Sequence, residues 1–83
     1  MRLAQLMPLP RHLLAATIER GRERIPVQVK SIGPSHLVVS AAPLACGERA
    51  RVIIACPLAP EGCEVTAEAV RTGGGDTWLS LVA

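Results

Sequence analysis

Residues 24–39 read Arg-Ile-Pro-Val-Gln-Val-Lys-Ser-Ile-Gly-Pro-Ser-His-Leu-Val-Val, and this stretch indicates the class of fold. In its first half, Ile25, Val27 and Val29 alternate with charged or polar residues. A period of two places the apolar side chains on one face of a strand and the polar ones on the other. Residues 31–36 then break the pattern, and an apolar, β-branched run follows. The stretch therefore predicts two strands joined by a short exposed loop.

Further apolar runs, separated by Gly and Pro, recur at short spacing along the chain. Residues 12–19 can form a strand or a helix, since Leu-Leu-Ala-Ala has high helix propensity. A strand is favoured because Gly21, between two apolar runs, can adopt the positive φ of a tight hairpin. Loops are expected at 41–47, 57–62 and 72–76. The six predicted strands cover residues 12–19, 24–30, 37–39, 49–56, 64–71 and 78–82.

The length and composition predict one domain with a modest core. The chain has 83 residues, 49% of them hydrophobic, and Trp78 is its only aromatic residue. Val, Leu, Ile and Ala must therefore fill a thin core. With no helical period in evidence, we expect an all-β, antiparallel small barrel or sandwich. The apolar segment 1–10 precedes a barrel domain at 11–83, and it forms either one helical turn or an extended arm.

Charge and motifs exclude several classes of function. The formal net charge of +2 is too small to predict nucleic-acid binding. The N-terminal segment is too short, and too interrupted by proline, to insert into a membrane or to be a signal peptide. No catalytic motif occurs, and the adjacent Ser35 and His36 point to opposite faces of an extended chain. The sequence therefore predicts a protein that is not an enzyme.

The chain has three cysteines, Cys46, Cys56 and Cys63, and none are in Cys-x-x-Cys spacing. Neither histidine is near a cysteine in the sequence, so no metal site and no cofactor are predicted. Free thiols are typical of the reducing cytoplasm, which is the predicted location.

The order of these segments resembles the PilZ domain family over residues 7–82. The likeness rests on three stretches: Gly-Arg-Glu-Arg-Ile at 21–25 leading to Leu-Val-Val at 37–39, Pro-Leu-Ala-Cys-Gly-Glu-Arg-Ala-Arg-Val at 43–52, and Val-Thr-Ala-Glu-Ala-Val-Arg at 65–71. The resemblance implies a small six-stranded antiparallel PilZ-like β-barrel. It also implies a link to the bacterial messenger cyclic di-GMP, which PilZ domains bind.

Family members bind this dinucleotide through Arg-x-x-x-Arg and Asp/Asn-x-Ser-x-x-Gly motifs. The first falls on residues 7–11, where only Arg11 is retained. The second falls on residues 31–36, where three defining positions differ. The ligand-binding residues that the resemblance implies are Arg11, Ser31, Gly33, Ser35 and His36. Losing one guanidinium and the carboxylate or amide removes charge-assisted hydrogen bonds of about 1.5–3 kcal/mol each.

The sequence therefore predicts a PilZ-like signalling or adaptor module in a bacterial cytoplasm, with weak or no cyclic di-GMP binding. Its predicted partner is another protein of a bacterial signalling or motility system. The alternative is a functional cyclic di-GMP receptor with non-standard binding residues, and a third possibility is a structural oligomerisation domain. A homo-oligomer is also expected, because the core is thin and Leu3, Leu6, Met7 and Leu9 have no obvious place inside a small barrel.

Overall fold

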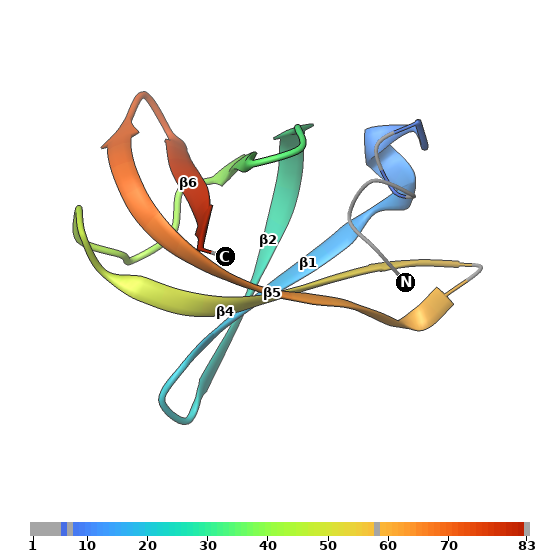
Figure 1. Cartoon of the computed structure of the whole chain (residues 1–83), viewed down its shortest axis with the longest axis horizontal. Helices are drawn as coiled ribbons and strands as arrows, with labels where there is room; N and C mark the ends of the chain where they lie inside the picture. Colours follow the sequence, from blue (N-terminus) through green and yellow to red (C-terminus); the bar gives the residue numbers. More distant parts are fainter. Residues whose placement is uncertain (1–5, 7, 58, 83) are drawn as a thin grey trace.

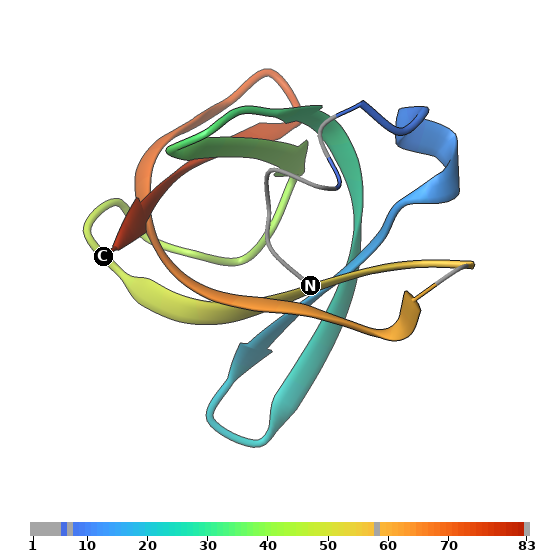
Figure 2. The same ribbon diagram turned by 45° about the vertical axis from the view of Figure 1, so that its right-hand side comes forward.

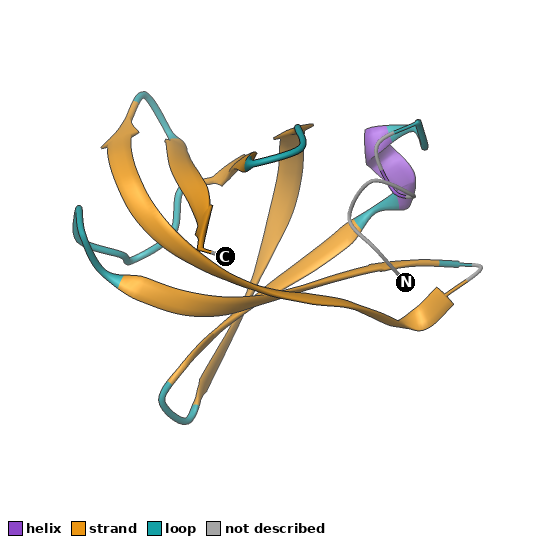
Figure 3. Cartoon of the chain, in the orientation of Figure 1, coloured by secondary structure: helices purple, strands orange, loops and turns teal. Residues whose placement is uncertain are grey.

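The computed structural model describes residues 6, 8–57 and 59–82, and these form one small antiparallel barrel (Figures 1 and 3). A 3₁₀ turn, η1 (Arg11–Leu13), precedes the first strand. The strands are β1 (Ala15–Arg20), β2 (Glu23–Ile32), β3 (His36–Ser40), β4 (Arg49–Cys56), β5 (Ala59–Gly73) and β6 (Asp76–Val82). The strand order around the barrel is β1-β2-β3-β6-β5-β4, and β4 closes it by pairing with β1. The prediction of an all-β barrel is confirmed.

The predicted alternation matches the observed inner faces of β1 and β4. Leu14, Ala16 and Ile18 are buried, as are Val52 and Ile54. Their neighbours along each strand point outward, so the interior is a single cluster of aliphatic side chains. Figure 2 shows the strands curving around this one interior, with the β1–β2 hairpin projecting from the barrel. Gly21 at the tip of that hairpin has a φ of +60°, as expected.

Several predicted boundaries are wrong, and one of them is the loop at 72–76, where β5 continues to Gly73 and β6 begins at Asp76. The first strand begins at Ala15, because η1 occupies the start of the predicted segment 12–19. The loop after β2 is shorter than 31–36, since β2 continues to Ile32 and β3 begins at His36. The predicted loop at 57–62 is largely strand, because β5 begins at Ala59, which pairs with Cys56 next to a bulge. Closing a barrel favours long, bent strands at this point.

Two apolar residues of the N-terminal segment pack with the core of the barrel, which contradicts part of one reason for expecting a homo-oligomer. Leu6 is fully buried in the core cluster, and Leu9 packs against it. Leu3 and Met7 lie outside the described residues. The closed barrel also leaves no open sheet edge among the described strands for a second copy to pair with, since each of the six is paired on both sides. Self-association stays a prediction, and it needs another surface.

Candidate functional site

The structure divides the predicted ligand-binding residues between two places. Arg11 lies in η1, and its Nη1 donates a hydrogen bond to the backbone carbonyl of Lys30. The Arg11 guanidinium therefore lies beside β2 at Lys30, the residue that precedes Ser31. Gly33, Ser35 and His36 form the end of the β2–β3 hairpin. The structure thus brings Arg11 to the strand of the second motif, and it gathers the other residues at the hairpin end.

The His36 imidazole packs directly on Gly33. A Cβ atom built on Gly33 would lie 2.5 Å from Nδ1 and 2.8 Å from Nε2 of His36. The ring therefore fills the space that any side chain at position 33 would need. Gly33 and the His36 ring therefore share one space in the turn, so a side chain at position 33 would require the ring to move.

Backbone hydrogen bonds fix this hairpin end against the barrel. The amide of Gly33 donates to the carbonyl of His36 over 2.9 Å, and the amide of Leu81 donates to the carbonyl of Ser35 over 2.9 Å. The second bond ties the turn to β6. The Ser35 side chain is exposed. The backbone of the turn is therefore fixed against the barrel, while the side chains of Pro34, Ser35 and His36 are exposed.

A hollow of about 350 Å³ lies beside Arg11. Its lining is drawn from η1, Leu14 and β2: Arg11, His12, Leu14, Gln28 and Val29. Of the five residues predicted from the family motifs, Arg11 is the one that lines it. The volume is at the low end of the range for small-molecule sites. Arg11 therefore faces a space whose lining does not include Gly33, Ser35 or His36.

A surface centred on Trp78 was missed by the sequence analysis. Thr77 and Leu79 are buried on the inner face of β6, so the indole between them lies on the outer face. The guanidinium of Arg71 lies 5.0 Å from the centroid of the indole ring. The alternation of side chains along a strand could have assigned this orientation, because an inward-pointing Leu79 places the neighbouring Trp78 on the outer face.

The outer face around Trp78 is apolar and adjoins the second motif. Ser31 pairs with Val38, Val38 pairs with Trp78, and Trp78 pairs with Arg71, in one row across β2, β3, β6 and β5. Val38 is buried although it points outward, because the indole lies directly opposite it. Val70 is 52% exposed beside this row. We call Val38, Val70, Arg71 and Trp78 the Trp78 face.

An ion pair borders the Trp78 face. The Lys30 ammonium on β2 lies 2.6 Å from Oδ1 of Asp76 on β6, so it reaches over β3. This carboxylate oxygen is buried, and the lysine is its close polar partner among the described residues. The pair therefore links β2 and β6, the two strands on either side of β3, at the border of the Trp78 face.

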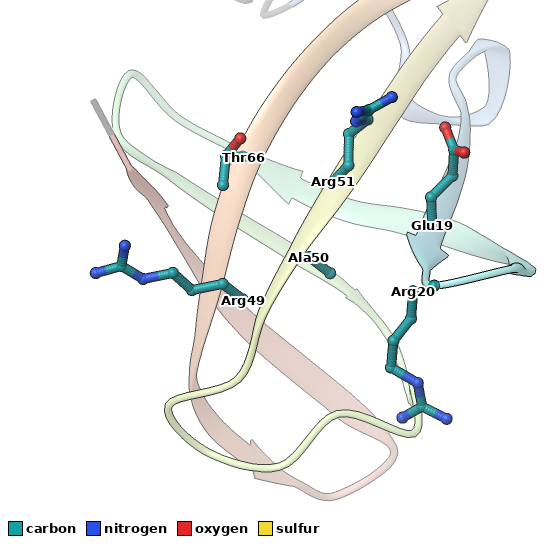
Figure 4. Close-up of a pocket in the computed structure, with 7 residues that line it drawn as sticks. Glu19, Arg20, Arg49, Ala50, Arg51 and Thr66 are labelled. Carbon is teal, nitrogen blue, oxygen red and sulfur yellow. The ribbon is translucent and has the colours of Figure 1, made fainter.

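A second hollow, of about 460 Å³, lies on the outer side of β1, β4 and β5 (Figure 4). Three arginines line it, and each is paired with a carboxylate. Arg20 lies 3.3 Å from Glu23, Arg49 lies 3.2 Å from Glu68, and Arg51 lies 3.0 Å from Glu64. Glu19 adds a further negative charge to the lining. Because opposite charges are interleaved, this hollow does not have the excess positive charge of a phosphate site.

Cys46 is exposed, Cys56 and Cys63 are buried, and all three are free thiols. Within residues 6, 8–57 and 59–82, no three His, Cys, Asp or Glu side chains are grouped so that they could hold a metal ion. In the same described part of the chain, no helix has the length and apolar character needed to cross a membrane.

Comparison with known proteins finds no family model, no curated protein and no solved structure that matches this chain.

Proposed function

We propose that the chain is a PilZ-like signalling or adaptor module that acts through protein–protein contact and binds cyclic di-GMP weakly or not at all. The packing of His36 on Gly33 carries this proposal. The family's turn presents a serine and leaves a glycine open to the ligand. Here the imidazole lies on Gly33 instead, so a nucleotide would have to displace the His36 ring to approach the backbone of Gly33.

The two cationic side chains near this turn, Arg11 and Lys30, already have partners within the chain. Arg11 donates to the Lys30 carbonyl, and Lys30 pairs with Asp76. A ligand with two phosphates would have to replace these contacts with its own, and it would find one guanidinium of the first motif where the family offers two. Charge-assisted bonds to the ligand are therefore few, and the loss of two or three such bonds weakens binding by orders of magnitude.

The Trp78 face supports a role in protein contact. Trp and Arg are enriched where partner proteins bind, because they combine a large apolar area with a polar group. In a chain with one aromatic residue, that residue lies at the surface, under Arg71 and next to the exposed Val70. We propose that this face binds another protein of a bacterial signalling or motility system in the cytoplasm.

The alternative function is a cyclic di-GMP receptor that uses non-standard residues. The hollow beside Arg11 favours it, because an arginine, a histidine and an amide side chain line the same space. This alternative predicts a dissociation constant below about 10 µM, which corresponds to about −6.8 kcal/mol. Replacement of Arg11 by alanine would then abolish binding, since Arg11 is the retained guanidinium of the first motif.

A photo-cross-linking experiment tests the contact role. Val70 is replaced by p-benzoylphenylalanine, and the full chain is irradiated in cells of its bacterial source. The proposal predicts a covalent adduct with one other protein, because Val70 is exposed at the edge of the Trp78 face. Adding Trp78→Ala should remove the adduct, since the indole supplies most of the apolar contact area. Mass spectrometry of the adduct identifies the partner.

The same cross-linker at Arg22 is the matched control. Arg22 is exposed at the tip of the β1–β2 hairpin, away from the Trp78 face, and should give no adduct with that protein. Circular dichroism of Trp78→Ala should retain the β-sheet spectrum of the wild type. An adduct that persists in Trp78→Ala, or one that forms equally from Arg22, would place the contact elsewhere and refute the role of this face.

A further inference from the structure

The outer surface of β1 and β4 is a bare sheet face with an apolar half and a charged half. The two strands pair in register, so Ala15 lies beside Ala55, Thr17 beside Ile53, and Glu19 beside Arg51. All of these side chains point outward, because the buried residues of both strands alternate with them. Leu13, Pro57 and Pro60 extend the apolar half and line a hollow of about 290 Å³ with both alanines.

Charges of alternating sign cross three strands at the other half of this face. Arg24 on β2, Glu19 on β1 and Arg51 on β4 lie in register, and Glu64 on β5 lies two residues away along the strand, opposite Ile53. Arg24 lies 3.8 Å from Glu19, and Arg51 lies 3.0 Å from Glu64. Figure 4 shows Glu19 and Arg51 next to each other on the neighbouring strands β1 and β4. All four side chains keep part of their surface open to solvent.

The central pair of this row, Glu19 beside Arg51, is complementary to the same pair in reversed order. Consider a two-fold axis in the plane of contact, parallel to the strands and midway between β1 and β4. The axis places β1 of one copy over β4 of the second copy. Glu19 then faces Arg51 of the second copy, and Arg51 faces Glu19 of the second copy, so each dimer contains this contact twice. The same operation places Ala15 over Ala55 and Leu13 over Pro57, so the apolar halves also meet.

We infer that two copies of this chain associate through the β1–β4 face as a symmetric dimer. The same two-fold axis brings together both the charged pair and the apolar residues of the two copies, as an isologous interface requires. Aligned sheets pack face to face in this way at an angle of about 30°. A standard interface needs about 800 Å² from each partner. That is about one sixth of the 5003 Å² surface of the barrel, and β1 and β4 lie at the centre of the face.

Sedimentation of charge-reversed variants tests the dimer and its axis together. Wild-type protein at tens of micromolar should have a mass near that of two chains. Glu19→Arg places a second arginine against Arg51 of the other copy, twice in each dimer, and Arg51→Glu places like negative charges together. Each variant alone should be monomeric, with self-association weakened about a hundredfold or more.

Mixing the two variants should restore a dimer. In the mixed pair, the arginine at position 19 of one copy faces the glutamate at position 51 of the other, and the second contact is matched as well. The mixture should sediment as a heterodimer of one chain of each kind. An interface that does not bring position 19 of one copy to position 51 of the other would not give this rescue.

Ala15→Arg is a second variant that leaves the ion pairs within the chain intact. It should also be monomeric, since it places a charge against Ala55 of the second copy. Thr72→Arg, which adds the same charge at an exposed position near the β5–β6 turn, should remain dimeric. A monomeric wild type, a dimeric Ala15→Arg, or a mixture that stays monomeric would each overturn the inference. The test is independent of the proposed function, because the Trp78 face lies across the barrel, where β3 pairs with β6.

Discussion

Ile54→Ala is expected to lower the free energy of unfolding by about 2–5 kcal/mol. Ile54 is fully buried on β4, in a core that contains no Phe or Tyr. Removing three carbons leaves a cavity that small aliphatic neighbours cannot fill without moving strands. A domain of 83 residues has a total stability of about 4–12 kcal/mol. This single change therefore removes a large part of the stability, which urea unfolding followed by circular dichroism would measure.

Ile53→Ala is the matched control for that prediction. It removes the same atoms from the neighbouring residue, whose side chain is on the outer face of β4. Measured at a dilute protein concentration, it should cost less than about 1 kcal/mol. Equal losses for the two variants would contradict the assigned inner and outer faces of β4.

Gly62→Ala is expected to destabilise the barrel by about 2–4 kcal/mol, for a different reason. Gly62 has a φ of +78°, a conformation that residues with a Cβ atom rarely adopt. The added Cβ would also lie 2.8 Å from the backbone oxygen of Ile54. That oxygen belongs to the paired strand, so rotation of a side chain cannot relieve the contact. Thermal unfolding should show the loss.

Gly74→Ala separates the cost of the positive φ from the cost of the close contact. Gly74 also has a positive φ, +60°, but nothing lies within 4 Å of the position of its Cβ atom. This variant should show the backbone cost alone, about 1 kcal/mol. If Gly62→Ala proves no more costly than Gly74→Ala, then the close approach of β5 to β4 at Gly62 is wrong.

Alternation predicted the inner faces of β1 and β4 because those strands are buried on one side and solvated on the other. It failed where the chain departs from strict pairing. The register shifts between Val29 and Ser31 and between Ala69 and Arg71. A bulge inserts one residue, so counting by two assigns the wrong face beyond it. Val70 and Arg71 are both exposed for that reason, and the Trp78 face was not predicted.

The candidate site was predictable in part. The resemblance pointed to the β2–β3 turn and to Arg11; the structure places Arg11 beside Lys30 of β2 and the other residues at the end of the hairpin, and their role in binding stays a prediction. The packing of His36 on Gly33 was not predictable, since the sequence shows two substitutions without showing that one fills the space left by the other. A pattern of residue types does not record which way a side chain turns.

Calorimetric titration with cyclic di-GMP tests the central claim most directly. Wild-type protein should show no binding at low micromolar concentrations. A variant with Met7→Arg, Ser31→Asp, Gly33→Ser and His36→Gly restores the family motifs, and His36→Gly also frees the space that a serine at position 33 requires. The account predicts that this variant binds in the micromolar range. Binding by the wild type with a dissociation constant below about 10 µM, or no binding by the restored variant, would contradict it.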